Sequence, residues 1–110
     1  MFGVLFANWQ VYTLATMHPL IQAHREQLLA LARRRGVTRL RVFGSMARGD
    51  ADESSDVDLL VSLPAKVSGL ALGGLLMDVR DLLGRKVDIV TEAALPRGMR
   101  ESVLASAIEL

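Results

Sequence analysis

The 110-residue sequence contains no cysteine, which excludes a disulfide framework and a thiolate zinc site and fits a cytoplasmic protein. Its formal net charge is only +1, too small by itself to indicate a nucleic-acid partner or an acidic membrane surface. No uninterrupted apolar run reaches the roughly 20 residues that a membrane span requires. We therefore expect neither membrane insertion nor direct nucleic-acid binding.

Hydrophobic residues make up 51% of the chain, enough for a packed core, and the length suits one domain. The first sixteen residues carry no charge, and they lack the basic region and cleavage site of a signal peptide. One interpretation of residues 1–16 is an apolar N-terminal arm or an extra strand. The other is that the natural chain starts at Met17 and that residues 1–16 are an artefact. We favour the second, because residues 17–110 form an intelligible domain without them.

The periodicity of apolar residues predicts an α/β (α+β) domain with a small mixed β-sheet flanked by helices. Pro19 suits the first turn of a helix that Gly36 ends, and Ser45 suits the N-cap of a short helix. Ser68 can cap a longer helix that ends at Gly84, although two glycines inside it weaken that prediction. Strands are predicted over residues 38–43, 57–63 and 86–90, and a last helix from residue 98.

The most informative stretch is residues 44–61, GSMARGDADESSDVDLLV. Asp56 and Asp58 are two residues apart on a predicted strand, so both carboxylates project from one face. Two carboxylates about 7 Å apart repel each other unless a cation lies between them. Their hard oxygen atoms suit Mg²⁺, which takes one or two carboxylates and completes its shell with water and phosphate oxygens.

Gly44 and Ser45 lie where the first strand meets the short helix and supply the complementary part of the site. Glycine allows a phosphate to approach the backbone closely, and a helix start offers unpaired N–H groups. Arg48 lies one turn further on and can reach the same anion. We therefore predict that Gly44, Ser45 and Arg48 bind the triphosphate group of a nucleotide.

Asp88 lies in the third predicted strand, and it would share a face with Asp56 and Asp58 if the two strands are neighbours. A third carboxylate there is what a two-metal site requires. One ion would be shared by Asp56 and Asp58, and the second would add Asp88. Asp88 could also accept a proton as general base.

This pattern resembles the signature of the DNA polymerase β-like nucleotidyltransferase superfamily: a Gly-Ser pair, a spacer, Asp-x-Asp and a later lone Asp. The sequences GSMARG and SDVDLLV more closely resemble the minimal nucleotidyltransferases, the MntA-like antitoxins. The resemblance implies a Mg²⁺-dependent enzyme that transfers AMP from ATP to a tyrosine hydroxyl of a HEPN-domain toxin, releasing pyrophosphate. It covers nearly all residues after Met17, and all three acidic positions are filled.

A second hypothesis is a binding module: an antitoxin that neutralises its partner by forming a complex, without catalysis. Both hypotheses require an apolar docking surface and allow a homo- or hetero-oligomer. Ser55, beside the aspartate pair, either orients a carboxylate or merely starts the strand. Asp78 and Asp81 are interpreted as a solvated helix face.

Overall fold

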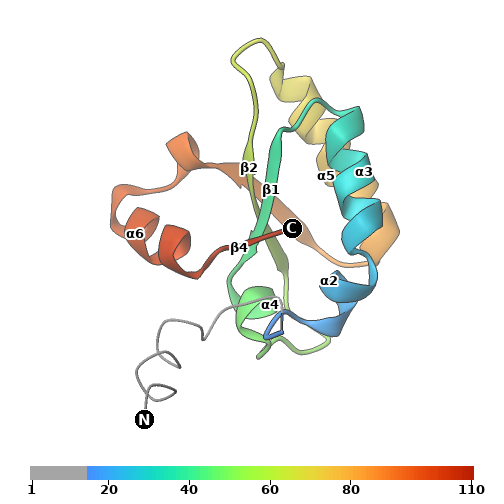
Figure 1. Cartoon of the computed structure of the whole chain (residues 1–110), viewed down its shortest axis with the longest axis vertical. Helices are drawn as coiled ribbons and strands as arrows, with labels where there is room; N and C mark the ends of the chain where they lie inside the picture. Colours follow the sequence, from blue (N-terminus) through green and yellow to red (C-terminus); the bar gives the residue numbers. More distant parts are fainter. Residues whose placement is uncertain (1–14) are drawn as a thin grey trace.

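The computed structural model describes residues 15–110, and its central feature is a four-stranded mixed sheet (Figure 1). The elements in chain order are α2 (Pro19–Ala23), α3 (Arg25–Arg34), β1 (Arg39–Phe43), α4 (Ser45–Arg48), β2 (Val57–Ser62), α5 (Gly69–Leu83), β3 (Val87–Thr91), η1 (Glu92–Ala94), α6 (Arg97–Ser106) and β4 (Ile108–Glu109). Residues 1–14, on which most of the predicted N-terminal arm falls, lie outside the described residues.

The strands follow the order β3-β2-β1-β4 across the sheet. β1 is antiparallel to β2 and to β4, whereas β2 and β3 are parallel, with α5 in the connection between them. A parallel pair needs such a crossover, because the chain must return to the starting edge before the second strand begins. As a result, the two strands that carry the predicted carboxylates are direct neighbours and begin at the same end of the sheet.

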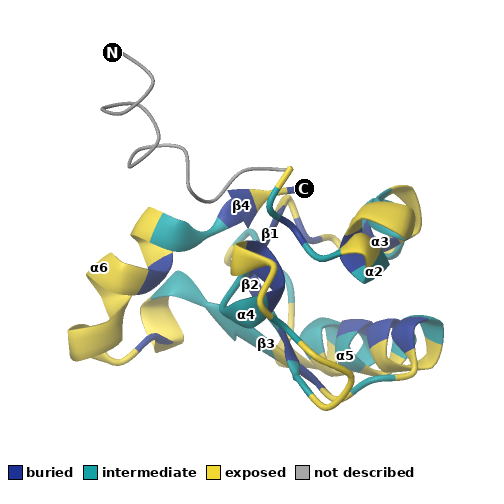
Figure 2. Ribbon diagram, turned by 90° about the horizontal axis from the view of Figure 1, so that it is seen from below, coloured by how far each residue is buried: buried dark blue, intermediate teal, exposed yellow. Residues whose placement is uncertain are grey.

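Each face of the sheet is covered by a different set of helices, as Figure 2 shows with α6 on one side and α3 and α5 on the other. Toward α3 and α5, the strands contribute fully buried side chains such as Val57 and Leu59 to the main core. Toward α6, Leu60 is fully buried in a smaller cluster with Leu95 and Val103. Because side chains alternate along a strand, Asp58 lies on the α6 side, the same side as Leu60.

The predicted fold class is confirmed, but two local predictions are wrong. The helix expected to run unbroken from Pro19 to Gly36 is divided at His24. The backbone N–H of His24 donates to the carbonyls of Gln22 and Ile21. Ser45 is not the N-cap of α4: Gly44 takes that position, and Ser45 is the first residue of the helix. Gly44 reaches its position with φ of 72°, a conformation that a serine would adopt only with strain.

The two adjacent glycines within α5 do not interrupt the helix, and Gly74 has a packing reason to be there. A Cβ at Gly74 would lie 2.4 Å from a guanidinium nitrogen of Arg35. Arg35 crosses α5 at this point and forms an ion pair of 3.0 Å with Asp78. Asp78 is therefore half-buried and paired rather than part of a freely solvated face, whereas Asp81 is exposed as predicted. Gly74 thus allows α3 and α5 to be linked by a charge pair.

The C-terminal part of the chain adds two elements that the periodicity did not indicate, η1 and β4. β4 is only two residues long and pairs with β1 at the edge of the sheet. Within residues 15–110 we find no helix that has both the length and the apolar character required to cross a bilayer.

Candidate functional site

The three predicted carboxylates come together at one end of the β2–β3 pair. In the parallel register, Asp58 of β2 lies directly beside Asp88 of β3. Residues paired in this way project their side chains from the same face. Asp56 precedes the first residue of β2 and lies two positions before Asp58, so it continues the same row. Asp56 and Asp58 are partly buried, whereas Asp88 is exposed.

The charge at this end of the sheet is unbalanced. Burial, followed by the neighbouring charges of Asp88 and Asp56, raises the pKa of Asp58 above its usual value. Arg48 acts in the opposite direction but does not cancel the other effects. Burial removes water that would solvate the ionised Asp58 carboxylate, and the two neighbouring carboxylates repel it. A set of hard oxygen donors in this condition fits a bound divalent cation.

Within residues 15–110, no three acidic, histidine or cysteine side chains are already grouped closely enough to hold a metal ion. This geometry is compatible with Mg²⁺, which keeps several water ligands and often takes oxygens from a substrate phosphate. The one cation paired with the carboxylates is Lys86, as far as the described residues show, with its Nζ atom 3.9 Å from Oδ2 of Asp56. That separation, between an exposed lysine and a partly buried aspartate, amounts to a weak ion pair.

Gly44 lies against Asp58 and connects the predicted glycine turn to the carboxylates. A Cβ at Gly44 would be 2.6 Å from Oδ2 of Asp58, closer than any side chain tolerates. Its backbone also has the positive φ that disfavours other residues. Any residue other than glycine would therefore displace the Asp58 carboxylate or the turn.

Arg48 is close enough to affect Asp58 electrostatically, but its side chain is engaged elsewhere. Its Nε donates to Oδ2 of Asp50 at 3.1 Å, and both side chains are exposed. Ser45 is partly buried at the start of α4. The structure thus gathers Gly44, Ser45 and Arg48 around one short helix beside Asp58.

The segment just before α2 fixes α4 from the outside. The hydroxyl of Thr16 donates to the carbonyl of Ala47 at 2.9 Å, and the backbone N–H of His18 donates to the carbonyl of Met46 at 2.8 Å. The carbonyl of Thr16 would also lie 2.3 Å from a Cβ at Gly49. Carbonyls at the end of a helix have no partner within it, so these bonds satisfy groups that α4 itself cannot.

Sequence reasoning missed two basic residues beside the carboxylates, Arg85 and Lys86. Their only sequence signal is their place immediately before the strand that carries Asp88. Arg85 bonds the backbone of the loop that leads into Asp56. Sequence reasoning also left Ser55 with two interpretations, and its hydroxyl bonds Asp52 within that loop rather than any of the three carboxylates.

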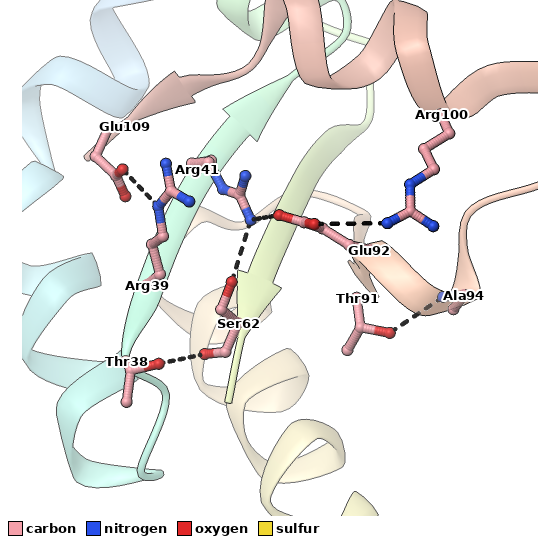
Figure 3. A network of polar contacts seen from close by, with 9 residues as sticks. All are labelled: Thr38, Arg39, Arg41, Ser62, Thr91, Glu92, Ala94, Arg100 and Glu109. Carbon is pink, nitrogen blue, oxygen red and sulfur yellow. Dashed lines mark hydrogen bonds and ion pairs between the residues drawn. The ribbon is translucent and has the colours of Figure 1, made fainter. Parts of the chain in front are cut away.

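The other end of the same sheet face carries a second charged group, in which Arg41 is paired through its terminal Nη2 atom, whereas its buried Nε has no hydrogen-bond partner (Figure 3). Arg41 is 5% exposed and donates to Glu92 at 2.7 Å and to the hydroxyl of Ser62 at 3.2 Å. Arg100 of α6 approaches the same carboxylate at 3.9 Å. Arg41 lies in the strand predicted over residues 38–43, and its contacts with the η1–α6 segment accompany its burial.

Two shallow hollows on the surface do not coincide with the carboxylates. One, of about 300 Å³, lies between α3 and α5 and is lined in part by Leu31 and Asp78. The other, of about 360 Å³, lies at the far end of β2 and β3, beside Ser62 and Glu92. The carboxylates instead lie at the beginning of β2 and β3, where Asp88 is exposed and Asp56 and Asp58 are partly buried.

The chain belongs to the nucleotidyltransferase domain family. Residues 24–110 match the model of that family. The chain is thus an enzyme of the nucleotidyltransferase class, as its sequence motif indicates.

Particular relatives narrow this class to the minimal nucleotidyltransferases. The chain is 36% identical to the protein adenylyltransferase MntA of Thermococcus cleftensis over 96 residues, covering 87% of this chain and 94% of that one. It is similar to the solved structure of a candidate minimal nucleotidyltransferase, with a TM-score of 0.74 and 47% identity over 82% of this chain and 92% of that one. A crystal structure of the toxin–antitoxin MntA-HepT shares the fold, with a TM-score of 0.61 and 18% identity over 80% of this chain and 69% of that one.

Proposed function

We propose that this chain transfers AMP from ATP to a tyrosine hydroxyl of a HEPN-domain toxin and thereby acts as the toxin's antitoxin. The observation that carries this proposal is the register that places Asp58 beside Asp88, with Gly44 packed against Asp58. The sequence similarity to the protein adenylyltransferase MntA supports the choice of a protein as the acceptor. The similarity to an MntA-HepT structure supports a toxin as that acceptor.

In this proposal, Asp56, Asp58 and Asp88 hold Mg²⁺, with one ion shared by the first two residues and a second that also uses Asp88. When bound, these ions neutralise the triphosphate and make the attacking hydroxyl more acidic. Burial, together with the neighbouring charges of Asp88 and Asp56, raises the pKa of Asp58, and this supports the assignment, since a bound cation would stabilise the ionised carboxylate.

The residues of the chain then position the reacting groups. The turn at Gly44 and Ser45 leaves room for phosphate oxygens beside Asp58, and Arg48 is near enough to exchange Asp50 for an anionic substrate. The tyrosine oxygen forms a bond to the α-phosphorus, the bond from that phosphorus to the bridging oxygen breaks, and pyrophosphate leaves. Asp88, the most exposed of the three carboxylates, accepts the hydroxyl proton.

The test uses purified protein, Mg²⁺, ATP and the HEPN-domain protein encoded beside it, with intact mass spectrometry of both proteins. Wild type is expected to add one or more AMP units to the partner, and Asp56→Ala/Asp58→Ala to add none. Asp81→Ala is the matched control, because Asp81 is exposed on α5 and takes part in no ion pair or side-chain hydrogen bond found among residues 15–110. It should transfer AMP like wild type.

The second candidate is an antitoxin that acts by complex formation alone. One observation favours an additional docking surface: Met99 and Leu104 of α6 are 49% and 38% exposed. If wild type transfers no AMP, yet wild type and the double variant bind the partner equally well, the binding module is correct and the transferase proposal is wrong for this acceptor.

A further inference from the structure

The loop between α4 and β2, residues 50–56, delivers Asp56 to the site, and its own hydrogen bonds give it a compact shape. Oδ1 of Asp52 accepts from the backbone N–H of Ser54 at 2.9 Å and from the hydroxyls of Ser54 and Ser55 at 2.8 and 3.1 Å. The hydroxyl oxygen of Ser55 accepts from the N–H of Asp52 at 2.9 Å. These bonds also lower the pKa of Asp52. They shape the loop, but they do not connect it to the sheet.

Arg85 provides that connection. Its Nη1 donates to the carbonyl of Asp52 at 2.6 Å and to the carbonyl of Ser55 at 3.3 Å. Ser55 immediately precedes Asp56, so one guanidinium group holds both the middle of the loop and the peptide unit beside the carboxylate. A charged donor makes stronger hydrogen bonds to carbonyls than a neutral donor does.

Lys86, the next residue, holds Asp56 from its other side. The carbonyl of Lys86 accepts from the N–H of Val57 at 2.9 Å, and its ammonium lies 3.9 Å from Oδ2 of Asp56. Asp56 is therefore bracketed: Arg85 fixes the residue before it and Lys86 the residue after it. Both come from the turn between α5 and β3, which also places Asp88.

We propose that Arg85 is a positioning residue for the metal–nucleotide site: it sets the backbone position of Asp56 relative to Asp58 and Asp88. This inference rests on the proposed function, because it assumes that the three carboxylates bind metal. Arg85 acts at a distance, through the carbonyls of Asp52 and Ser55, and is not a catalytic residue. In this way Arg85, just before β3, orients the carboxylate of Asp56, which lies about thirty residues earlier in the sequence.

The structure separates this role from a general contribution to folding. The contacts that hold the sheet together here, the pairing of β2 with β3 and the burial of Val57 and Val87, do not involve the guanidinium group. Removing that group should therefore loosen the loop while the sheet persists. A buried core residue would behave differently, because its removal lowers the stability of the whole domain.

The experiment compares Arg85→Met, Arg85→Lys and, as a matched control, Arg80→Met. Arg80 is an exposed arginine of α5, and it makes no ion pair or side-chain hydrogen bond found among residues 15–110. Three quantities are measured on the full chain: Mn²⁺ binding by electron paramagnetic resonance in the presence of a non-hydrolysable ATP analogue, amide hydrogen exchange, and the thermal midpoint.

Arg85→Met is expected to weaken Mn²⁺ binding about 10-fold or more, as removal of groups that orient metal ligands usually does. Its amides in residues 52–57 should exchange faster, while those of β1 stay as protected as in wild type. Arg85→Lys should recover part of the affinity, since an ammonium can still donate to one carbonyl, and Arg80→Met should match wild type. The thermal midpoint of Arg85→Met should fall by no more than a few degrees.

Unchanged Mn²⁺ binding in Arg85→Met, with tight binding in wild type, would overturn the positioning role and leave the proposed function intact. A large fall in the thermal midpoint with faster exchange throughout the sheet would also overturn it, since Arg85 would then support the fold in general. Absence of Mn²⁺ binding in wild type would overturn both the positioning role and the metal site on which it rests.

Discussion

The α6 side of the sheet carries charged groups at both of its ends, and the two ends are organised in opposite ways. At one end, Asp58 is partly buried beside Asp88, and burial, followed by the neighbouring carboxylates, raises its pKa. At the other end, Glu92 is bonded to Arg41 and approached by Arg100, and its pKa is lowered. Ion pairs with Glu92 link Arg41 of the sheet to the η1–α6 segment, whereas the carboxylate end is the surface at which we propose that a cation binds.

The comparison has a physical basis in how carboxylates are compensated. A carboxylate that pairs with an arginine in the folded protein stabilises the fold when it is ionised. A carboxylate that has only other carboxylates as neighbours in the folded protein destabilises the fold when it is ionised. Natural proteins keep the second arrangement mainly where function requires it, because stability alone would remove it.

The largest effect is expected on activity at the carboxylate end. Asp58→Asn keeps the shape of the side chain but removes the charge that would bind a cation. We expect AMP transfer to fall by at least about 100-fold, in line with the cost of losing a metal ligand. The rate is measured by intact mass of the partner over time, and transfer at more than a tenth of the wild-type rate would contradict the assignment of Asp58.

At the Glu92 end, the expected effect is on stability. Glu92→Gln leaves the buried Arg41 without its anionic partner, so the urea midpoint should fall clearly while transfer per folded molecule stays unchanged. Glu109→Gln is the matched control, because the Arg39–Glu109 pair is half-exposed on both sides and should contribute about 0.5 kcal/mol or less. Equal midpoints for the two variants would show that burial of Arg41 does not matter.

The same variant gives the pH dependence of this end. The folded protein lowers the pKa of Glu92, so the ionised carboxylate stabilises the fold above the usual range of a glutamate and loses this effect as the pH falls through the lowered value. The difference in urea midpoint between wild type and Glu92→Gln should therefore shrink on acidification. A difference that stays constant from neutral pH to about pH 3 would contradict the pairing.

The junction between the turn and the carboxylates is tested by two glycines. Gly44→Ala places a Cβ 2.6 Å from Oδ2 of Asp58 at a positive φ, whereas Gly84→Ala has a similar φ of 65° but open space around it. Gly84 is in the left-handed helical region, where alanine costs about 1–2 kcal/mol. Gly44, with ψ of −152°, is in a region essentially restricted to glycine, so Gly44→Ala meets greater backbone strain as well as the clash. Chemical denaturation should show a larger loss for Gly44→Ala, and only this variant should lose transfer. Equal losses would mean that neither the backbone conformation of Gly44 nor the approach of Asp58 excludes a side chain there.

The smallest effect is a gain in stability at the carboxylate end. The folded state raises the pKa of Asp58, so its ionisation destabilises the fold once the pH has risen through that value. In the presence of EDTA at neutral pH, Asp58→Asn should therefore be more stable than wild type. The partial exposure of Asp58 limits the gain to about 0.5 kcal/mol, or roughly 2–4 °C. Lower stability than wild type would show that the charge of Asp58 is already compensated.

Several features could be predicted from local sequence because local chemistry decides them. The phase of Val57 and Leu59 against Asp56 and Asp58 follows from the alternation of side chains along a strand. The ends of α3 and α5 follow from Gly36 and Gly84, which adopt the positive φ expected of helix-terminating glycines. These residues need only their neighbours in the chain to specify their conformation.

Other features were beyond prediction, because they depend on contacts between distant segments. The sequence predicts the strand that contains Arg41, but only the packing of the η1–α6 segment makes Arg41 a buried partner of Glu92. From the sequence, Gly74 is expected to weaken the helix. Only the position of Arg35, which lies against Gly74 and pairs with Asp78, explains why glycine is present there. The sequence predicts Ser45 as the N-cap of α4. In the structure the N-cap is Gly44, where the close approach of Asp58 requires glycine.

The sequence by itself thus determined the class of the protein, since the Gly-Ser turn and the three aspartates carry their chemistry in their spacing. The tertiary structure decided how these parts meet: the parallel register of Asp58 with Asp88, the contact of Gly44 with Asp58, and the hold of Arg85 on the loop before Asp56. The physical reason is that spacing along a strand fixes which face a side chain takes, whereas strand order, register and long-range hydrogen bonds arise only when the whole chain packs.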